Sequence, residues 1–196
     1  MQIPIFPLGS VLFPGGVLPL RIFEPRYIDM VSKCMRESSE FGVVLIRQGA
    51  EARLSRDTEQ PEIFTVGTMA RIIDFSQADH GLLGIVAQGT QKFSVRDTSE
   101  QADHLMLAEV DVLPEEPAGE LLPEHQPLID VLLELAEHPL VKKLKIDVDV
   151  TEARAVSFRL AELLPVEPEI KQALLQMQWP KERLTELGRI VKKFQG

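Results

Sequence analysis

The side chains that could carry covalent or acid–base chemistry are few and scattered along the chain. There is one cysteine, Cys34, and the four histidines stand alone at His80, His104, His125 and His138. A structural zinc site needs Cys and His ligands clustered at short spacings, and one cysteine cannot supply the sulfur ligands. We therefore expect no metal ion and no cofactor.

Signatures of nucleotide and acyl chemistry are missing as well. No segment matches the phosphate-binding loop Gly-x-x-x-x-Gly-Lys-Ser/Thr. The Gly-x-Ser-x-Gly turn of serine hydrolases does not occur, and Ser10 leads into apolar residues that are typical of packing. Glu115 and Glu116 fall in an acidic, proline-rich stretch, where we expect them to be exposed and without catalytic function. A hydrolase is thus a hypothesis that no group of residues supports.

Cys34 falls on the apolar stripe of a predicted helix. Pro25 suits the first helical position, because the N–H that proline lacks is not needed there. Tyr27, Val31 and Cys34 then recur at helical spacing. No base or basic residue that could lower the thiol pKa is evident, so we interpret Cys34 as buried and unreactive.

Composition and charge exclude several classes of protein. Of the 196 residues 44% are hydrophobic and 26% charged, which is ordinary for a soluble globular protein. The formal net charge of −9 disfavours nucleic-acid binding, which depends on neutralising phosphates. The apolar runs are too short to span a membrane, and the N-terminus does not resemble a secretion signal. A single cysteine fits a reducing compartment, so we expect a cytoplasmic protein that does not bind membranes.

The pattern of the sequence changes near the connector Leu113–Glu120. Before it, short apolar or alternating segments predict strands. They are Ile3–Phe6, Val17–Phe23, Phe41–Ile46, Glu62–Phe75, Leu82–Gln88, Lys92–Asp97 and Ala108–Val112, with a hairpin at Gly89-Thr90-Gln91 and a bulge or bend at Gly67. We expect a small barrel or strongly curved sheet over residues 1–115.

After the connector, helical periodicity predicts three or four helices over residues 116–196. The segment Leu128–Leu144 is apolar around much of its circumference, so we expect it to pack on the sheet as well as on other helices. Asp149 and Glu152 have the spacing of a capping box before the next helix. Pro180 opens the last one.

Two neighbouring segments carry a specific family resemblance. Ile3–Gly15 and Leu18–Tyr27 closely resemble the start of the Lon protease N-terminal domain, and Arg21–Tyr27 is the strongest part of the match. The similarity continues through Phe41–Ile46, Val66–Ile72, Gly89–Val95, Ala108–Pro114 and the helical part, so it covers almost the entire chain.

The resemblance implies an α+β fold: a PUA-like, six-stranded β-barrel or curved sheet with one inserted helix, then a C-terminal helical subdomain packed on it. It also implies recognition of unfolded or tagged polypeptides. In the full-length protease, ATPase and Ser–Lys peptidase domains follow, whereas this sequence stops at Gly196. We therefore expect a substrate-recognition module that is not an enzyme. Its expected partners are unfolded or specific client polypeptides and a protease or other quality-control protein, for which it would act as an adaptor.

The residues that mark the family could either bind a ligand or stabilise the fold. They are Pro14, Gly15, Arg21, Glu24, Pro25, Arg26 and Tyr27. A glutamate flanked by two arginines can form charge-assisted hydrogen bonds that fix the junction between a strand and a helix. We favour this structural role over ligand contact. RNA binding stays as the alternative function, because PUA-like barrels include RNA-binding members, although the negative charge argues against it.

Overall fold

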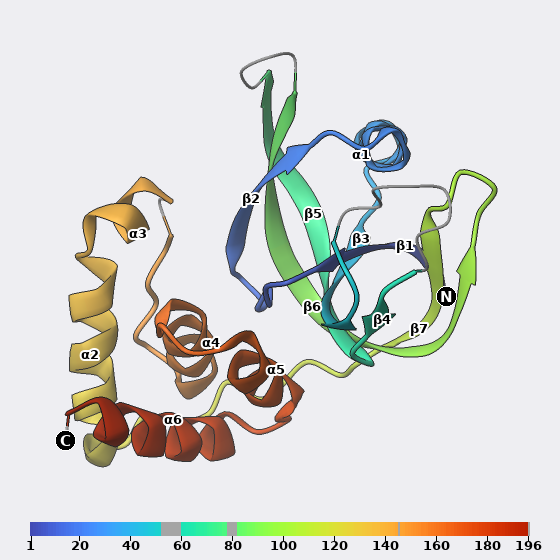
Figure 1. Cartoon of the computed structure of the whole chain (residues 1–196). Helices are drawn as coiled ribbons and strands as arrows, with labels where there is room; N and C mark the ends of the chain where they lie inside the picture. Colours follow the sequence, from blue (N-terminus) through green and yellow to red (C-terminus); the bar gives the residue numbers. More distant parts are fainter. Residues whose placement is uncertain (52–59, 78–81, 145, 196) are drawn as a thin grey trace. The chain divides into compact units, whose positions relative to one another are not determined.

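The computed structural model describes residues 1–51, 60–77, 82–144 and 146–195, so His80 lies outside the described residues (Figure 1). These ranges divide into two compact units, Met1–Pro114 and Glu115–Gly196, and each is described by itself. No helix in the described ranges is long and apolar enough to cross a membrane.

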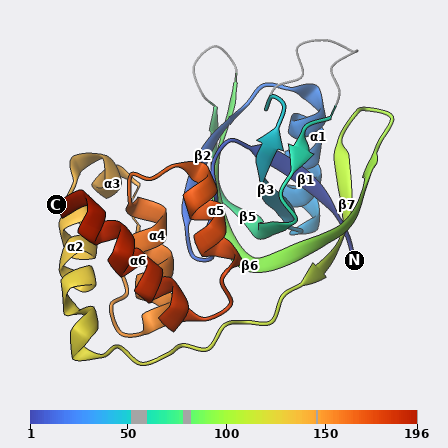
Figure 2. The same cartoon turned by 60° about the horizontal axis from the view of Figure 1, so that its bottom comes forward.

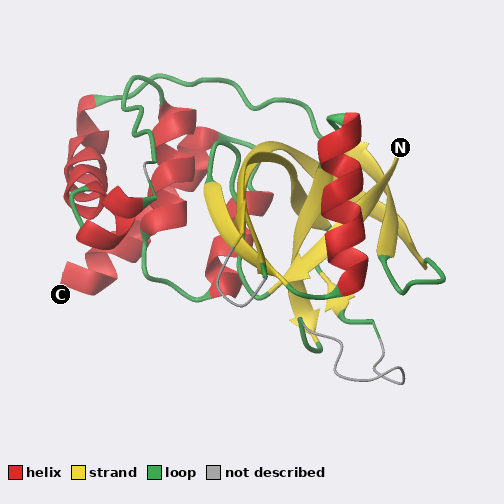
Figure 3. Cartoon of the chain, turned by 90° about the horizontal axis from the view of Figure 1, so that it is seen from above, coloured by secondary structure: helices red, strands yellow, loops and turns green. Residues whose placement is uncertain are grey.

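The first unit is a mostly antiparallel sheet with one helix. Its strands are β1 (Gln2–Leu8), β2 (Val17–Ile22), β3 (Phe41–Gln48), β4 (Glu62–Ile63), β5 (Val66–Gln77), β6 (Leu83–Glu100) and β7 (Met106–Val112). Helix α1 (Pro25–Glu37) begins at Pro25 as predicted and lies against the strands (Figure 3).

The paired strands of this unit form a closed path. The path runs β1-β7-β6-β5-β3, and a parallel pairing joins β3 back to β1. Strand β2 pairs with β6, and β4 pairs with β3. Register shifts in the β5–β6 and β6–β7 pairings mark bulges, which bend the strands and increase their twist.

The predicted hairpin at Gly89-Thr90-Gln91 is wrong, because β6 runs through these residues without reversing. Gly89 has a different role. A Cβ placed there would lie 2.2 Å from the carbonyl oxygen of Phe13, so only glycine lets the β1–β2 turn approach so closely. The amide N of Gly89 donates to Gly16 O, and Gly89 O accepts from the amide N of Gly15, both at 2.9 Å.

The predicted strand Glu62–Phe75 is divided into β4 and β5, with a break at Phe64-Thr65. Gly67, at the start of β5, allows another close approach. A Cβ on it would come within 2.5 Å of Val43 O and of Val44 Cγ1.

Two hydrophobic clusters fill the first unit. One surrounds α1 and includes Phe6, Tyr27, Met30, Val31, Cys34 and Phe41; the other includes Ile3, Ile5, Val44, Met69 and Phe93. Phe13, Phe41 and Phe93 are fully buried. Because burial of large apolar side chains is the main favourable term in folding, these clusters hold the sheet and α1 together.

The second unit is helical (Figure 2). It contains a 3-10 turn at Pro123–His125 and the helices α2 (Gln126–Ala136), α3 (Pro139–Lys143), α4 (Ala153–Leu163), α5 (Pro168–Gln176) and α6 (Pro180–Gln195). Helix α4 contacts α2, α5 and α6. Its buried residues Val156, Leu160 and Ala161 therefore form the centre of this unit.

Two predictions about these helices are wrong. The segment Leu128–Leu144 is not one helix, because it breaks at His138 and Pro139 starts α3; proline in a helix interior would remove a hydrogen bond and clash with the preceding turn. The Asp149–Glu152 capping box does not form. Asp149 Oδ1 instead accepts hydrogen bonds from the backbone N and Oγ1 of Thr151.

The expectation that Glu116 is exposed is also wrong. Glu115 is exposed and pairs with Arg154, but Glu116 is 6% exposed and both of its carboxylate oxygens accept hydrogen bonds from buried Arg183. Neighbouring residues in an acidic connector thus have opposite environments, because only one of them meets a buried cation.

Candidate functional site

Arg26 joins the start of α1 to the turn between β6 and β7. Its Nε and Nη2 lie 3.0 and 2.9 Å from Oε2 of Glu24, the residue at the N-cap of α1, and both side chains are largely buried. Its Nη1 donates to the carbonyl oxygen of His104 at 2.9 Å. The guanidinium therefore ties together two segments that are 78 residues apart in sequence.

Tyr27 anchors the same corner in the core. It is 4% exposed, and its ring centroid lies 4.1 Å from that of Phe6. The guanidinium of Arg26 lies 4.6 Å from the Tyr27 ring centroid, a cation–π geometry. Burial raises the pKa of the phenol from 10.0 to about 12, so Tyr27 is protonated at neutral pH.

The other family-motif residues lie apart from this cluster. Within the described part of the chain, Glu24 bonds to Arg26 and not to Arg21, which is exposed in β2 opposite Gly84 of β6. Pro14 and Gly15 shape the turn before β2, where Gly15 has φ +75°. The structure thus brings four of the seven residues together, Glu24 through Tyr27.

A groove of about 730 Å³ lies beside this corner, between α1, the first residues of β1 and the β6–β7 turn. Buried apolar side chains from both hydrophobic clusters form its base: Ile3, Met30, Cys34, Met69 and Leu105. A pocket of this volume with an apolar base and polar rim is typical of ligand sites.

The rim of the groove is charged and predominantly acidic. Asp29, Glu37, Glu40 and Asp103 contribute carboxylates, against the cations of Lys33 and Arg36. Sequence reasoning missed the groove, because its residues come from segments 1–4, 29–40, 69 and 101–107, which only folding brings together. Helical periodicity around Cys34 was the one signal that could have pointed to its base.

Cys34 is 4% exposed and contributes to the base of the groove. Burial is the main reason that the pKa of its thiol is raised, while a hydrogen bond to Ser39 acts in the opposite direction. The interpretation of Cys34 as a buried thiol agrees with this environment, because the nucleophilic thiolate form is disfavoured.

The Arg26 corner sets the position of one wall of the groove. The carbonyl oxygen of His104 accepts from Arg26 Nη1 and from Gln60 Nε2, at 2.9 and 2.8 Å. His104 adopts a left-handed conformation, φ +69°, which turns the chain between Asp103 and Leu105, and both of these neighbours line the groove. None of the seven family-motif residues lines the described groove itself.

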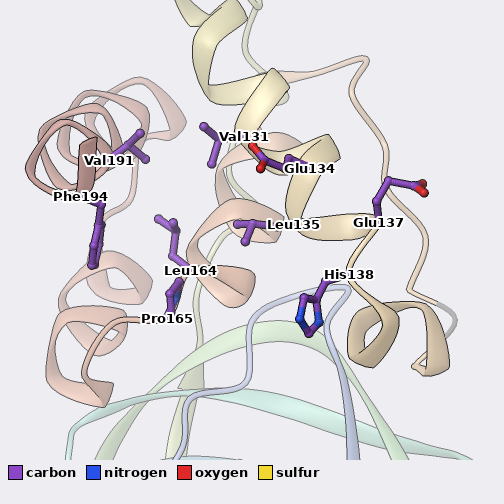
Figure 4. A pocket seen from close by; sticks show the side chains of 9 residues that line it. All are labelled: Val131, Glu134, Leu135, Glu137, His138, Leu164, Pro165, Val191 and Phe194. Atoms are coloured by element: carbon purple, nitrogen blue, oxygen red, sulfur yellow. The ribbon is translucent and has the colours of Figure 1, made fainter. Parts of the chain in front are cut away.

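The helical unit contains a second pocket, of about 530 Å³ (Figure 4). Its lining is mainly apolar and comes from α2, from Glu137 and His138 directly after α2, from α6 and from the residues that follow α4. Among the described residues of the whole chain, no group of three or more His, Cys, Asp or Glu side chains could hold a metal ion.

Comparisons with known proteins agree on one family. The model of the ATP-dependent protease La (LON) substrate-binding domain matches residues 2–193. A crystal structure of a Lon N-terminal domain protein from Xanthomonas campestris is 35% identical, with a TM-score of 0.74, and the match covers 95% of this chain and 96% of that one.

Curated relatives match over only a small part of their own length. Lon protease 2 of Myxococcus xanthus is 33% identical over 119 residues, which are 60% of this chain and 14% of the protease. Protein cereblon of Danio rerio is 32% identical over 118 residues, 58% of this chain and 26% of that protein. The family model and the Xanthomonas structure, in contrast, extend over both the sheet and the helical unit. This chain therefore belongs to the family of ATP-dependent protease La (LON) substrate-binding domains.

Proposed function

We propose that this chain recognises unfolded or extended polypeptide segments, and that the groove beside α1 is where they bind. The observation that carries the proposal is the groove's construction: an apolar base of buried side chains under a charged rim, in a domain of the Lon substrate-binding family. Apolar client side chains would contact Met30, Met69 and Leu105, while the client backbone and polar groups stay at the rim.

The charge of the rim gives the proposed site a preference. Four side-chain carboxylates against two side-chain cations favour client segments in which apolar residues alternate with Lys or Arg. The negative charge of the rim and the formal net charge of −9 both disfavour binding of RNA, because they repel its phosphates. Binding should be weak, with Kd in the micromolar range, about −8 kcal/mol, because ordering an extended chain offsets much of the favourable contact energy.

The proposed module acts without catalysis of its own and delivers clients to a protease or another quality-control protein, as an adaptor in the cytoplasm. The phosphate-binding loop is absent from its sequence. We further propose that the strand path, which closes through the β1–β3 pairing, is the PUA-like barrel that the family resemblance implies.

A substitution that fills the groove tests the proposal. Ser32 lies on the exposed side of α1 and lines the groove, so Ser32→Phe should block it at little cost in stability. Ile28→Phe is the matched control, because Ile28 lies one turn earlier on α1, is 37% exposed and does not line the groove.

Fluorescence anisotropy with a labelled, permanently unfolded polypeptide and with a single-stranded RNA, across a salt series, provides the measurement. We expect Ser32→Phe to weaken polypeptide binding by about tenfold, and Ile28→Phe to leave it unchanged. Tight, steeply salt-dependent RNA binding without polypeptide binding would refute the proposal in favour of the RNA alternative.

A further inference from the structure

We propose that the helical unit carries a second site, separate from the groove, which binds a large apolar side chain followed by Lys or Arg in a partner polypeptide. The site is the pocket of about 530 Å³ described above, and every residue that lines it lies between Val131 and Phe194. It therefore goes beyond the proposed groove, because it belongs to the other compact unit and takes a single anchor residue with its basic neighbour, whereas the groove takes an extended segment.

The walls of the pocket come from two helices that both pack on α4. Helix α2 provides Val131 and Leu135, one turn apart, and α6 provides Val191 and Phe194. Leu164 and Pro165 follow the end of α4 and form the base between them. Figure 4 shows these apolar side chains gathered around the hollow.

The dimensions of the pocket define what it can hold. Val131 to Leu135 and Val191 to Phe194 each span about one helical turn, roughly 5 Å, and Glu137 and His138 extend the lining beyond the end of α2. The apolar part of the pocket therefore accommodates one or two side chains and not a whole helix. Its volume lies within the range of small-ligand sites. A Phe, Leu or Met side chain would bury its apolar surface against Val131, Leu164 and Val191.

Phe194 gives the pocket an aromatic edge. Its side chain lines the pocket but is 60% exposed, which is unusual for a phenylalanine beside an apolar hollow. A partner ring or guanidinium that contacts its open face would gain stacking or cation–π energy.

One carboxylate beside the apolar walls sets the charge preference. Glu134 lines the pocket and is exposed, and its carboxylate has no hydrogen bond or ion pair within the described residues. Glu137 is instead paired with Lys142, and its carboxylate points away from the hollow in Figure 4. Lys192 and Lys193 are exposed on α6 but do not line the pocket. A Lys or Arg next to the apolar anchor could therefore form an ion pair with the Glu134 carboxylate.

Three labelled peptides test this chemistry by fluorescence anisotropy. The first contains Phe-Arg within a Gly/Ser sequence, the second has Ser in place of the Phe, and the third has Glu in place of the Arg. We expect the first to bind, and each of the other two to bind at least about tenfold more weakly.

Protein variants locate the binding. Phe194→Ser should weaken binding of the Phe-Arg peptide by about tenfold. Glu134→Lys should reverse the charge preference, so that the Phe-Glu peptide binds better than the Phe-Arg peptide. Leu133→Ser is the matched control: Leu133 is on the same helix as Glu134, is 45% exposed and does not line the pocket, so binding should not change. Circular dichroism and the fluorescence of Trp179, the single tryptophan, verify that each variant is folded.

Three outcomes would overturn the second site. The first is that the Phe-Arg peptide does not bind the wild-type chain. The second is that Phe194→Ser and Leu133→Ser weaken its binding equally. The third is that Ser32→Phe weakens its binding while Phe194→Ser does not. The last would place the peptide in the groove, so it would refute this site and support the proposed function. If Ser32→Phe leaves polypeptide binding unchanged but the Phe-Arg peptide binds at the helical pocket, the second site is supported and the proposed function of the groove is refuted.

Discussion

Arg183 and Glu116 form a bidentate ion pair that is almost completely excluded from water. Arg183 Nη1 and Nη2 donate to the two carboxylate oxygens of Glu116 at 2.9 and 2.7 Å. The guanidinium also donates to the carbonyl oxygens of Leu174 and Met177 and to Oγ of Ser157, and it lies 4.1 Å from the centroid of the Phe158 ring. This arginine therefore links the beginning of the helical unit to α4, α5 and α6.

Removing one partner of this pair should destabilise the helical unit strongly. Arg183→Leu leaves the Glu116 carboxylate buried without its cation, and we expect a loss of about 3–5 kcal/mol in the free energy of unfolding. Urea unfolding followed by Trp179 fluorescence measures it, because the single tryptophan lies in this unit. Glu115→Gln is the control, since its exposed pair with Arg154 should contribute at most about 1 kcal/mol. Equal effects of both substitutions would contradict this assignment.

The corner at Glu24 should prove structural. Glu24→Ala removes a largely buried, charge-assisted partner of Arg26, so we expect a loss of about 1.5–3 kcal/mol in stability. Any loss of polypeptide binding should follow the unfolded fraction, because Glu24 does not line the groove. Arg21→Ala, at the exposed arginine, should change stability by no more than about 0.5 kcal/mol. Lost binding with an unchanged melting temperature would show instead that Glu24 contacts the client.

Tyr27 should ionise far above the usual range. It is the single tyrosine, so the ultraviolet absorbance of phenolate reports on it alone. We expect an apparent pKa of about 12 in the folded protein and of about 10 in denaturant. Because folding raises this pKa, the associated stability is complete below pH 10 and declines as the pH rises toward 12, by up to about 3 kcal/mol. Coincident titration curves for the folded and denatured chain would exclude burial of the phenol.

Two glycines should respond in opposite directions to alanine. Gly89→Ala forces a Cβ against the carbonyl oxygen of Phe13, at 2.2 Å, and we expect a loss of at least about 2 kcal/mol, because backbone must move. Gly188 lies within α6, and a Cβ there meets nothing within 4 Å. Gly188→Ala should therefore raise stability by up to about 1 kcal/mol through helix propensity. Thermal unfolding of both variants is the measurement, and a stable Gly89→Ala protein would mean that the β1–β2 turn is not held against β6.

Local patterns in the sequence determined the elements that depend on neighbouring residues. Alternation and apolar runs located β1, β2, β3 and β7, and Pro25 with the stripe of Tyr27, Val31 and Cys34 located α1. These patterns are informative because side-chain period follows directly from strand and helix geometry. The family motif Arg21–Tyr27 likewise identified the family before any contact was known.

Tertiary structure alone decided what distant residues do to each other. Gly89 resembles a turn residue in sequence, but its role is set by the carbonyl of Phe13. Glu116 resembles an exposed connector residue until Arg183, 67 positions later, neutralises it. The groove and the helical pocket also combine segments that are far apart in the chain. Burial, close approach and pairing are properties of distances in space, and short-range periodicity in the sequence carries no information on those distances.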